Sequence, residues 1–193
     1  MWHNSFLLGS VIFSTLFTQP PGAEVTGQVL MLGKPVRDAV VYLEGAPKPS
    51  PLPKAVVDQR NKTFVPHVLV VTVGTTVEFP NNDVVLHNVF AYYEAKRFDL
   101  GMYRRGTSRS VTFDKPGIVA LLCNIHPDMS AYIFVVDTPY YALTDKNGQF
   151  RIRSIVPGTY TLRVWHESGA ALSQKVTLKG NEAYTLSLAL KGK

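Results

Sequence analysis

The sequence holds a single cysteine, Cys123, in a chain of 193 residues. One cysteine cannot form an internal disulfide, so the chain is not a small disulfide-stapled fold. A chain of this length can bury a core of its own. An unpaired thiol is a liability in an oxidising compartment, whereas a bound metal would hold the sulfur as a thiolate. The alternative is that Cys123 is a buried, inert thiol.

Several functional signatures are missing. The sequence has no zinc-finger spacing, no phosphate-binding loop and no dense basic run, so nucleic acid is not an expected partner. The formal net charge of +6 is dispersed along the chain and only weakly favours anionic partners. The five histidines form no histidine-rich cluster along the sequence, which argues against an enzyme that needs such a cluster for a second metal ion.

The N-terminal stretch lacks charge. Residues 1–23 contain no Asp, Glu, Lys or Arg, and residues 6–17 form an apolar run. This run is shorter than the roughly 20 residues that a bilayer-spanning helix needs. It fits a signal peptide cleaved after Ala23, so we expect a periplasmic or secreted protein without stable membrane insertion after cleavage. A buried strand or an uncleaved anchor is the alternative.

The remainder shows no convincing helical period and predicts an all-β protein. Residues 149–153 and 159–165 alternate apolar and polar side chains, as half-solvated antiparallel sheets do. The strands before the proline-rich stretch 45–53 are too few to form a stable domain. We therefore predict one discontinuous antiparallel β-sandwich from residues 24–50 and 138–193. Residues 51–137 would form a second domain inserted into one of its loops, with a polar loop at 96–109.

A metal site is predicted around the loop 123–129. Cys123, His126 and Met129 supply a thiolate, an imidazole and a thioether, a donor set that suits copper. His87 offers the second imidazole of a blue-copper site, and Asn88 is a candidate for hydrogen bonds that tie the two ligand segments together. A site held this firmly would change little when copper changes oxidation state, which favours electron transfer.

Each of these residues has an alternative explanation. His87 could be a core histidine satisfied by hydrogen bonds, and Met129 could be ordinary packing. Asp128 is expected to be solvated rather than a ligand. His67 and His166 lack partners at ligand spacing and are expected to be structural.

The segment around these residues resembles the cupredoxins. The resemblance rests on Phe64-x-Pro66, Val73-Gly74-x-Thr76-Val77-x-Phe79, Asn82-Asp83, His87-Asn88-Val89 and Cys123-x-x-His126-x-x-Met129. The short ligand loop and its His126-Pro127 step are most similar to amicyanin, with a shorter loop than plastocyanin. The resemblance implies a Greek-key β-sandwich holding one type 1 copper on His87, Cys123, His126 and Met129.

The flanking segments resemble carboxypeptidase regulatory-like domains, which are transthyretin-like or starch-binding-like sandwiches. The resemblance rests on Val25-x-Gly27-x-Val29, Gly33-x-Pro35-Val36-x-x-Ala39-Val40-Val41, Thr144-Asp145-x-x-Gly148-x-Phe150-x-Ile152 and Pro157-Gly158-x-Tyr160-x-Leu162. It implies a role in stability or adhesion, and some relatives bind sugars.

Together these features predict an electron carrier rather than an enzyme. The resemblance implies a redox partner such as a dehydrogenase or a cytochrome, with the exposed edge of His126 as electron port. Methylamine utilisation is a conceivable setting. The alternatives are a copper store or chaperone and a carbohydrate-binding or envelope structural module. A polar stretch rich in cations could be a docking patch for an acidic partner or a plain solvated loop: Lys96, Arg97, Arg104, Arg105 and Arg109.

Overall fold

The computed structural model describes residues 22–92 and 95–191, and within them every regular element is a strand. The predicted all-β class is confirmed. Most of the predicted signal peptide lies outside the described residues. The first strand begins at Ala23, whose side chain is fully buried. No helix that could cross a membrane occurs in the described part of the chain.

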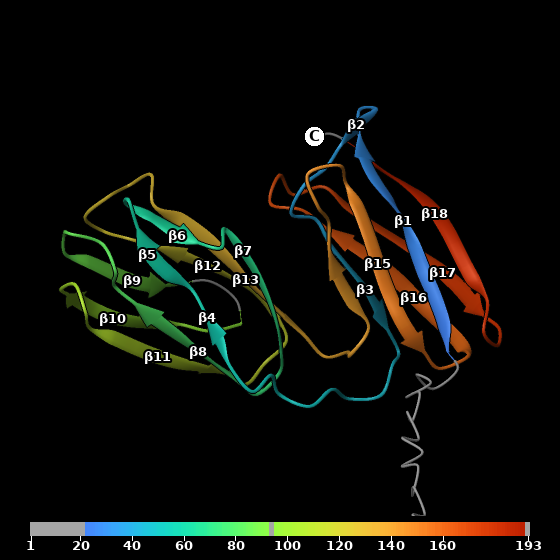
Figure 1. Cartoon of the computed structure of the whole chain (residues 1–193), viewed down its shortest axis with the longest axis horizontal. Helices are drawn as coiled ribbons and strands as arrows, with labels where there is room; N and C mark the ends of the chain where they lie inside the picture. Colours follow the sequence, from blue (N-terminus) through green and yellow to red (C-terminus); the bar gives the residue numbers. More distant parts are fainter. Residues whose placement is uncertain (1–21, 93–94, 192–193) are drawn as a thin grey trace, which may run out of the picture.

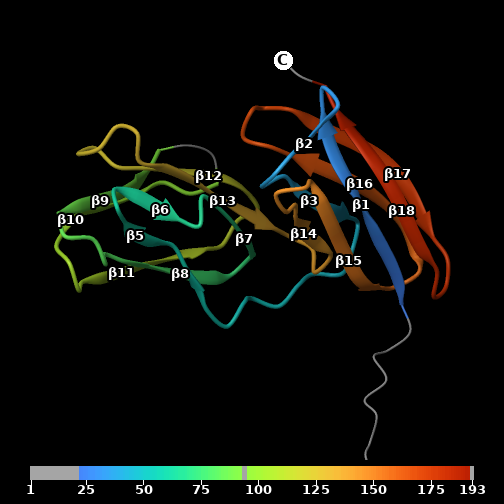
Figure 2. The ribbon, with the colours of Figure 1, turned by 45° about the horizontal axis from the view of Figure 1, so that its top comes forward.

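Two β-sandwiches lie side by side (Figures 1 and 2). We call the first the flanking sandwich, because its strands come from both ends of the described chain. Its strands are β1 (Ala23–Met31), β2 (Lys34–Pro35), β3 (Val40–Glu44), β14 (Tyr141–Leu143), β15 (Gln149–Ile155), β16 (Gly158–Trp165), β17 (Ala171–Leu178) and β18 (Ala183–Leu190). They form one sheet in the order β15-β1-β18, with β2 paired to β1, and a second in the order β14-β3-β16-β17.

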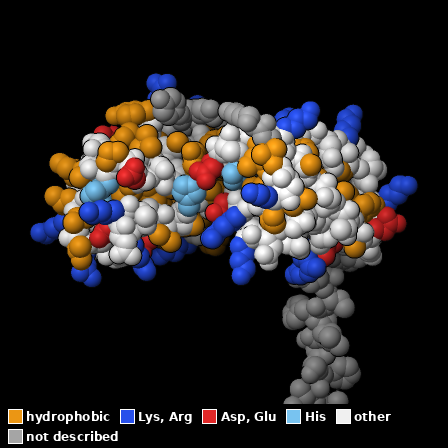
Figure 3. Space-filling view, turned by 90° about the horizontal axis from the view of Figure 1, so that it is seen from above, with side chains coloured by type: hydrophobic (Ala, Val, Ile, Leu, Met, Phe, Trp, Pro, Cys, Tyr) orange, Lys and Arg blue, Asp and Glu red, His pale blue; other side chains and the backbone are white. Residues whose placement is uncertain are grey.

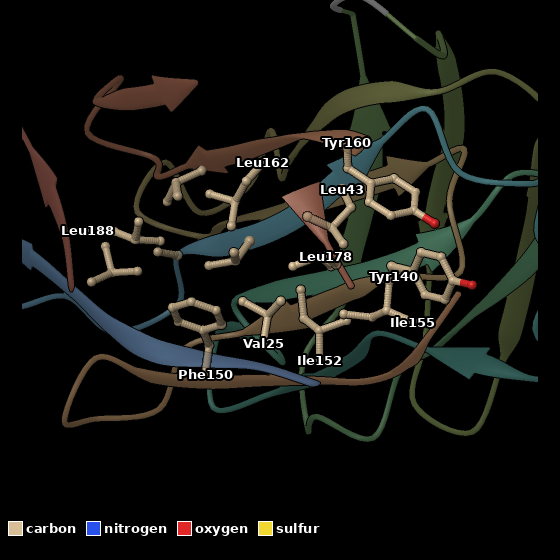
Figure 4. Close-up of a cluster of buried hydrophobic side chains, with 14 of the residues drawn as sticks. Val25, Leu43, Tyr140, Phe150, Ile152, Ile155, Tyr160, Leu162, Leu178 and Leu188 are labelled. Carbon is tan, nitrogen blue, oxygen red and sulfur yellow. The ribbon is translucent and has the colours of Figure 1, made fainter. Parts of the chain in front are cut away.

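The core of the flanking sandwich is formed by side chains that alternate between buried and exposed along its strands. In β15, Phe150 and Ile152 are buried while their neighbours in sequence are exposed. The alternation breaks at Ser154, which has a positive φ of 55°, and the pairing of β15 with β1 shifts register there. This β-bulge turns Ile155 inward as well. Figure 4 shows these side chains among the others of the core.

The inner sandwich comprises the strands between the two parts of the flanking sandwich. They are β4 (Ala55–Val56), β5 (Asp58–Arg60), β6 (Thr63–Val65), β7 (Val68–Thr72), β8 (Thr75–Pro80), β9 (His87–Ala91), β10 (Phe98–Tyr103), β11 (Ser108–Phe113), β12 (Gly117–Leu122) and β13 (Ser130–Val136). One sheet has the order β10-β9-β12-β13-β7 and the facing sheet the order β11-β8-β4, with β5 and β6 forming a separate hairpin. The chain passes from one sheet to the other between β7 and β8, between β8 and β9, between β10 and β11, and between β11 and β12, as in a Greek key.

One expectation is wrong. Residues 96–109 were expected to form a polar loop, but β10 and β11 occupy most of this segment. In β10, Tyr103 is buried and Phe98 and Leu100 are partly buried, while Asp99 and Gly101 are exposed. Asp99 and Gly101 are typical of loops and obscure the strand pattern in the sequence.

The two sandwiches share an apolar interface. Strand β13 is apolar on both faces because Ile133 and Val135 point into the inner core, while Phe134 and Val136 pack against the flanking sandwich. The ring centroid of Trp165 on β16 lies 5.2 Å from that of Phe134. A continuous apolar run is what a strand buried on both sides requires. Trp165 therefore serves packing between the sandwiches rather than an open sugar platform.

Candidate metal centre

Three potential ligands converge at the end of the inner sandwich away from the flanking sandwich. One donor atom from each of His87, Cys123 and His126 lies within 4.8 Å of the others. The sulfur of Cys123 is 4.0 Å from Nδ1 of His126, and the ring centroids of His87 and His126 are 4.9 Å apart. Among the described residues, this is the one such group of His, Cys and acidic side chains.

Strand alternation explains why the first two ligands meet. On β12 the residues facing the core are Val119 and Leu121, and Cys123 continues the same period just beyond the strand. On the neighbouring strand β9, His87 and Val89 face the same core and are fully buried. Because β9 and β12 are paired, their inward side chains lie on one face of one sheet. The period of two thus delivers an imidazole and a thiol to the same place.

A tight turn positions the rest of the ligand loop, residues 123–129. The backbone N–H of Met129 donates to the carbonyl of His126 at 2.9 Å. Pro127 occupies the second position of this four-residue turn, where its fixed φ is favourable. The turn leaves His126 half-buried and returns Met129, 1% exposed, to the core that contains Cys123. The role of Met129 as a fourth ligand stays a prediction.

His87 is oriented by a carboxylate. Its Nε2–H donates to Oδ2 of Asp83 at 2.9 Å, and its ring is fully buried. Its other nitrogen, Nδ1, is buried and has no hydrogen-bond partner. A buried ring nitrogen without a hydrogen-bond partner costs free energy unless another group, such as a metal ion, binds its lone pair. With Nε2 carrying the proton, Nδ1 has a free lone pair for a metal.

Asp83 is itself held firmly. Its Oδ2 also accepts the backbone N–H of Lys62 at 2.7 Å, and its Oδ1 accepts that of Val84 at 2.7 Å. Donation from the Lys62 backbone and then from the His87 ring lowers the pKa of the Asp83 carboxyl to about 2. The side chain therefore stays ionised and fixes the tautomer of His87.

Asn81 braces the segment that carries Asp83. Its side chain is fully buried, and its Nδ2 donates to the carbonyls of Val85 at 3.0 Å and Tyr103 at 2.9 Å. Its Oδ1 accepts the backbone N–H of Asp83 at 2.9 Å. Nearby, burial raises the pKa of Tyr103 to about 12, so its hydroxyl stays a neutral donor to the carbonyl of Phe79.

The sequence prediction and the geometry differ at Asn88 and at Asp83. Asn88 was expected to join the two ligand segments, but its Nδ2 donates to Asp99 on β10 at 2.7 Å, and its Oδ1 is buried without a partner. Asp83 appeared in the sequence only as part of a motif and a turn. The signal in the sequence was the spacing of four residues between Asp83 and His87. This spacing is ambiguous, because within a turn it does not determine which side chains face each other.

The donor set fits copper. An ion bound at about 2.0–2.3 Å to nitrogen and sulfur ligands brings those ligands within about 5 Å of one another, and the donor atoms here already meet that limit. Two imidazoles and one thiolate near a buried thioether suit copper better than harder metals. The unpartnered Nδ1 of His87 supports the same conclusion.

His67 and His166, expected to be structural, lie outside this group. His67 connects the sandwiches: its Nε2 lies 2.7 Å from Oε2 of Glu167 in the flanking sandwich, and its Nδ1 lies 3.2 Å from the carbonyl of Ser130 in the inner one. His166 is paired locally with Ser168 at 3.0 Å.

Comparison with known proteins gives one match to a family model. Residues 128–191 match the family model of the carboxypeptidase regulatory-like domain. The match begins inside the ligand loop and includes β13, which pairs with β12 and β7 of the inner sandwich. No curated protein matches the chain significantly.

Among solved structures, those similar to part of this chain include a purple cupredoxin, an amicyanin and a copper-containing nitrite reductase. A purple cupredoxin from Nitrosopumilus maritimus is 24% identical over 42% of this chain and 99% of its own, with a TM-score of 0.40. A reduced amicyanin variant is 26% identical over 51% of this chain and 99% of its own, with a TM-score of 0.40. A copper-containing nitrite reductase from Thermus scotoductus is 29% identical over 56% of this chain but 28% of its own, with a TM-score of 0.42.

Proposed function

We propose that this protein is an exported one-electron carrier with a single type 1 copper centre. His87, Cys123 and His126 would hold the metal strongly, and Met129 would be a weaker fourth ligand. The observation that carries the proposal is the convergence of one donor atom from each of these three residues, together with the buried Nδ1 of His87, which has no hydrogen-bond partner. Copper bound there would supply a one-electron couple.

The protein's contribution is to hold the ligands still. Asp83 fixes the His87 ring, the turn at Pro127 fixes His126 and Met129, and the sheet fixes Cys123. Ligands held by a sheet and a short turn have little freedom to rearrange between oxidation states. This rigidity favours a carrier, and we propose that the protein is not an enzyme.

The half-buried His126 is the proposed electron port. Apolar side chains with large exposed fractions occur on the segments beside it: Val84 is 79% exposed, Leu86 49% and Ile125 39%. Exposed apolar patches mark interaction sites. We propose that a redox protein such as a dehydrogenase or a cytochrome docks there, in the periplasm or outside the cell.

The proposal includes a division of the chain into domains. Residues 51–137 would form the copper domain, and residues 24–50 with 138–193 the flanking domain, after removal of residues 1–23. The pairing of β1 with both β15 and β18 supports this division, because it joins segments that the inner sandwich separates in sequence.

The visible spectrum of the copper-loaded protein tests the proposal. A type 1 site gives an intense thiolate-to-copper band, which Cys123→Ser should abolish and His87→Gln should weaken or shift. His166→Gln is the matched control, because His166 bonds locally in the flanking sandwich. A colourless copper-loaded protein, or a Cys123→Ser variant that keeps the band, would refute the assignment.

Electrochemistry separates the carrier from a copper store or chaperone. A carrier should show a reversible one-electron couple and keep its metal against a moderate Cu(I) chelator. A chaperone should surrender Cu(I) quickly and show no reversible couple.

A further inference from the structure

The end of the inner sandwich around His126 is built from turns that hydrogen bonds hold together. The backbone N–H of Lys62, in the β5–β6 turn, donates to Asp83. Asn81, in the same segment as Asp83, accepts the backbone N–H of Gly106 in the β10–β11 turn at 2.8 Å. We call the solvent-facing surface of these turns and of the ligand loop the distal face.

The exposed apolar side chains of the distal face, which we call its apolar centre, are Val84, Leu86 and Ile125. Met102 lies beside this face on β10, is 61% exposed and pairs with Asn88, next to His87. In Figure 3, hydrophobic side chains and several basic ones gather at the end of the inner sandwich that lies away from the flanking sandwich.

The exposed cations of the distal face form a basic rim, which we define as Lys62, Arg104 and Arg105. All three are exposed, and none belongs to an ion pair among the pairs found in residues 22–92 and 95–191. The turns that carry these side chains are hydrogen-bonded to residues 81–83, directly before Val84.

The neighbouring acids offset this rim only in part. Asp58 pairs with Arg60. Asp83 keeps its negative charge, because the His87 ring that donates to it is neutral, but it is only 7% exposed. Asp99 is exposed and lies on β10, where it accepts hydrogen bonds from Asn88 and from the backbone of Gly101. Asp128 is the exposed carboxylate of the ligand loop.

The structure also divides the cationic patch expected from the sequence. Lys96 pairs with Asp114 at 2.7 Å, and Arg97 precedes the end of β10 that pairs with Ala91 rather than with His87. Arg109 lies over the ring of Tyr103, 5.1 Å from its centroid. Of the five cations, Arg104 and Arg105 are the two that reach the distal face as unpaired charges.

We propose that the distal face receives an anionic redox partner, which the basic rim of Lys62, Arg104 and Arg105 steers onto the apolar patch beside His126. This inference rests on the proposed function for its redox step, but the electrostatic surface exists without the metal. Opposite charges raise association rates at low ionic strength, while the apolar centre sets the contact at the electron port.

Metal-free protein gives the first test. Hexacyanochromate(III), a redox-inert paramagnetic trianion, should broaden the backbone amide signals of Lys62, Arg104 and Arg105 more than those of the flanking sandwich. Arg104→Glu with Arg105→Glu should abolish the broadening. Broadening spread evenly over basic residues of both sandwiches, or confined to the flanking one, would overturn the proposal whether or not the protein binds copper.

The copper-loaded protein gives the second test. One electron passes from the reduced protein to hexacyanoferrate(III), yielding hexacyanoferrate(II) and the oxidised protein. The double Glu variant should react about tenfold more slowly at low salt, and faster with the cationic tris(phenanthroline)cobalt(III). Both effects should shrink towards 1 M salt, where the Debye length is about 3 Å.

A matched control separates location from net charge. Arg97→Glu with Lys115→Glu changes the net charge equally, but both residues lie at the other end of the strands that lead to the metal centre. This variant should react at nearly the wild-type rate. Equal slowing by both double variants would show that net charge alone acts and would refute a local rim. If the copper-loaded protein lacked the visible band, the proposed function would be refuted. The broadening of amide signals in the metal-free protein would still test whether the basic rim binds anions.

Discussion

Replacing Asp83 by Asn tests the carboxylate that positions His87. Asp83 accepts three hydrogen bonds, one from the His87 ring and two from backbone N–H groups. An amide has one acceptor oxygen, so its NH2 group must face at least one of these donors. The orientation that keeps the bonds to His87 and Lys62 sacrifices the bond to the backbone of Val84.

The magnitude follows from these three contacts. Losing one hydrogen bond costs about 1 kcal/mol, and exchanging two bonds to a charged acceptor for neutral ones costs about 0.5–1 kcal/mol each. We therefore expect the metal-free protein to lose about 2–3 kcal/mol of unfolding free energy. A partner that orients a metal ligand typically contributes 10–100-fold to affinity, so copper affinity should fall by about that factor.

Two assays and one control decide the outcome. Urea unfolding of the metal-free protein gives the stability change, and competition with a chelator gives the copper affinity. Asp128→Asn removes the same charge from the exposed part of the ligand loop without touching His87. If Asp83→Asn resembles Asp128→Asn in both assays, Asp83 does not position the ligand, and our account of the unpartnered nitrogen is wrong.

Three further predictions concern stability. Trp165→Ala should lower the unfolding free energy by about 2–4 kcal/mol, because it removes the ring packed on β13; a change below about 1 kcal/mol in urea unfolding would mean that the sandwiches hardly stabilise each other. Gly27→Ala should cost about 3 kcal/mol or prevent folding, because its Cβ would lie 2.2 Å from the carbonyl oxygen of Leu186; a normal melting temperature would contradict this packing. Acid should destabilise the protein as pH falls from about 4 to about 2, because the pKa of Asp83 is lowered from 3.8 to about 2, so its stabilisation is present above the unfolded value and is lost on protonation; unfolding curves should show a flatter pH dependence in this window for Asp83→Asn.

Much of the fold could be predicted because the relevant signals are local. Alternation revealed β15 and β16. Strand β10 was missed because Asp99 and Gly101, at exposed positions of the strand, resemble a loop. The bulge at Ser154 could not be foreseen, because it depends on register with β1.

The candidate site shows the same division. The spacing of Cys123, His126 and Met129 marked a ligand loop, and His87, which lies upstream and is followed by Asn88, offered the remaining imidazole. The prediction that Asn88 joins the two ligand segments by hydrogen bonds was wrong, because the Asn88 side chain donates to Asp99 on β10 instead. Which neighbouring strand a side chain meets depends on sheet order, and sheet order leaves no periodic trace in the sequence.

By itself, the sequence determined the chemistry available: one thiol, few histidines, and an alternation that puts Cys123 in phase with Val119 and Leu121 on its own strand. Only the tertiary structure decided that β9 pairs with β12, that Asp83 orients His87, that Trp165 joins the sandwiches, and that the turns of Lys62 and of Arg104–Arg105 both bond to residues 81–83. The physical reason is that alternation is set by neighbouring residues, whereas these contacts join strands and turns distant in the chain. Such turns meet only when buried polar groups, above all Asn81, find their hydrogen-bond partners.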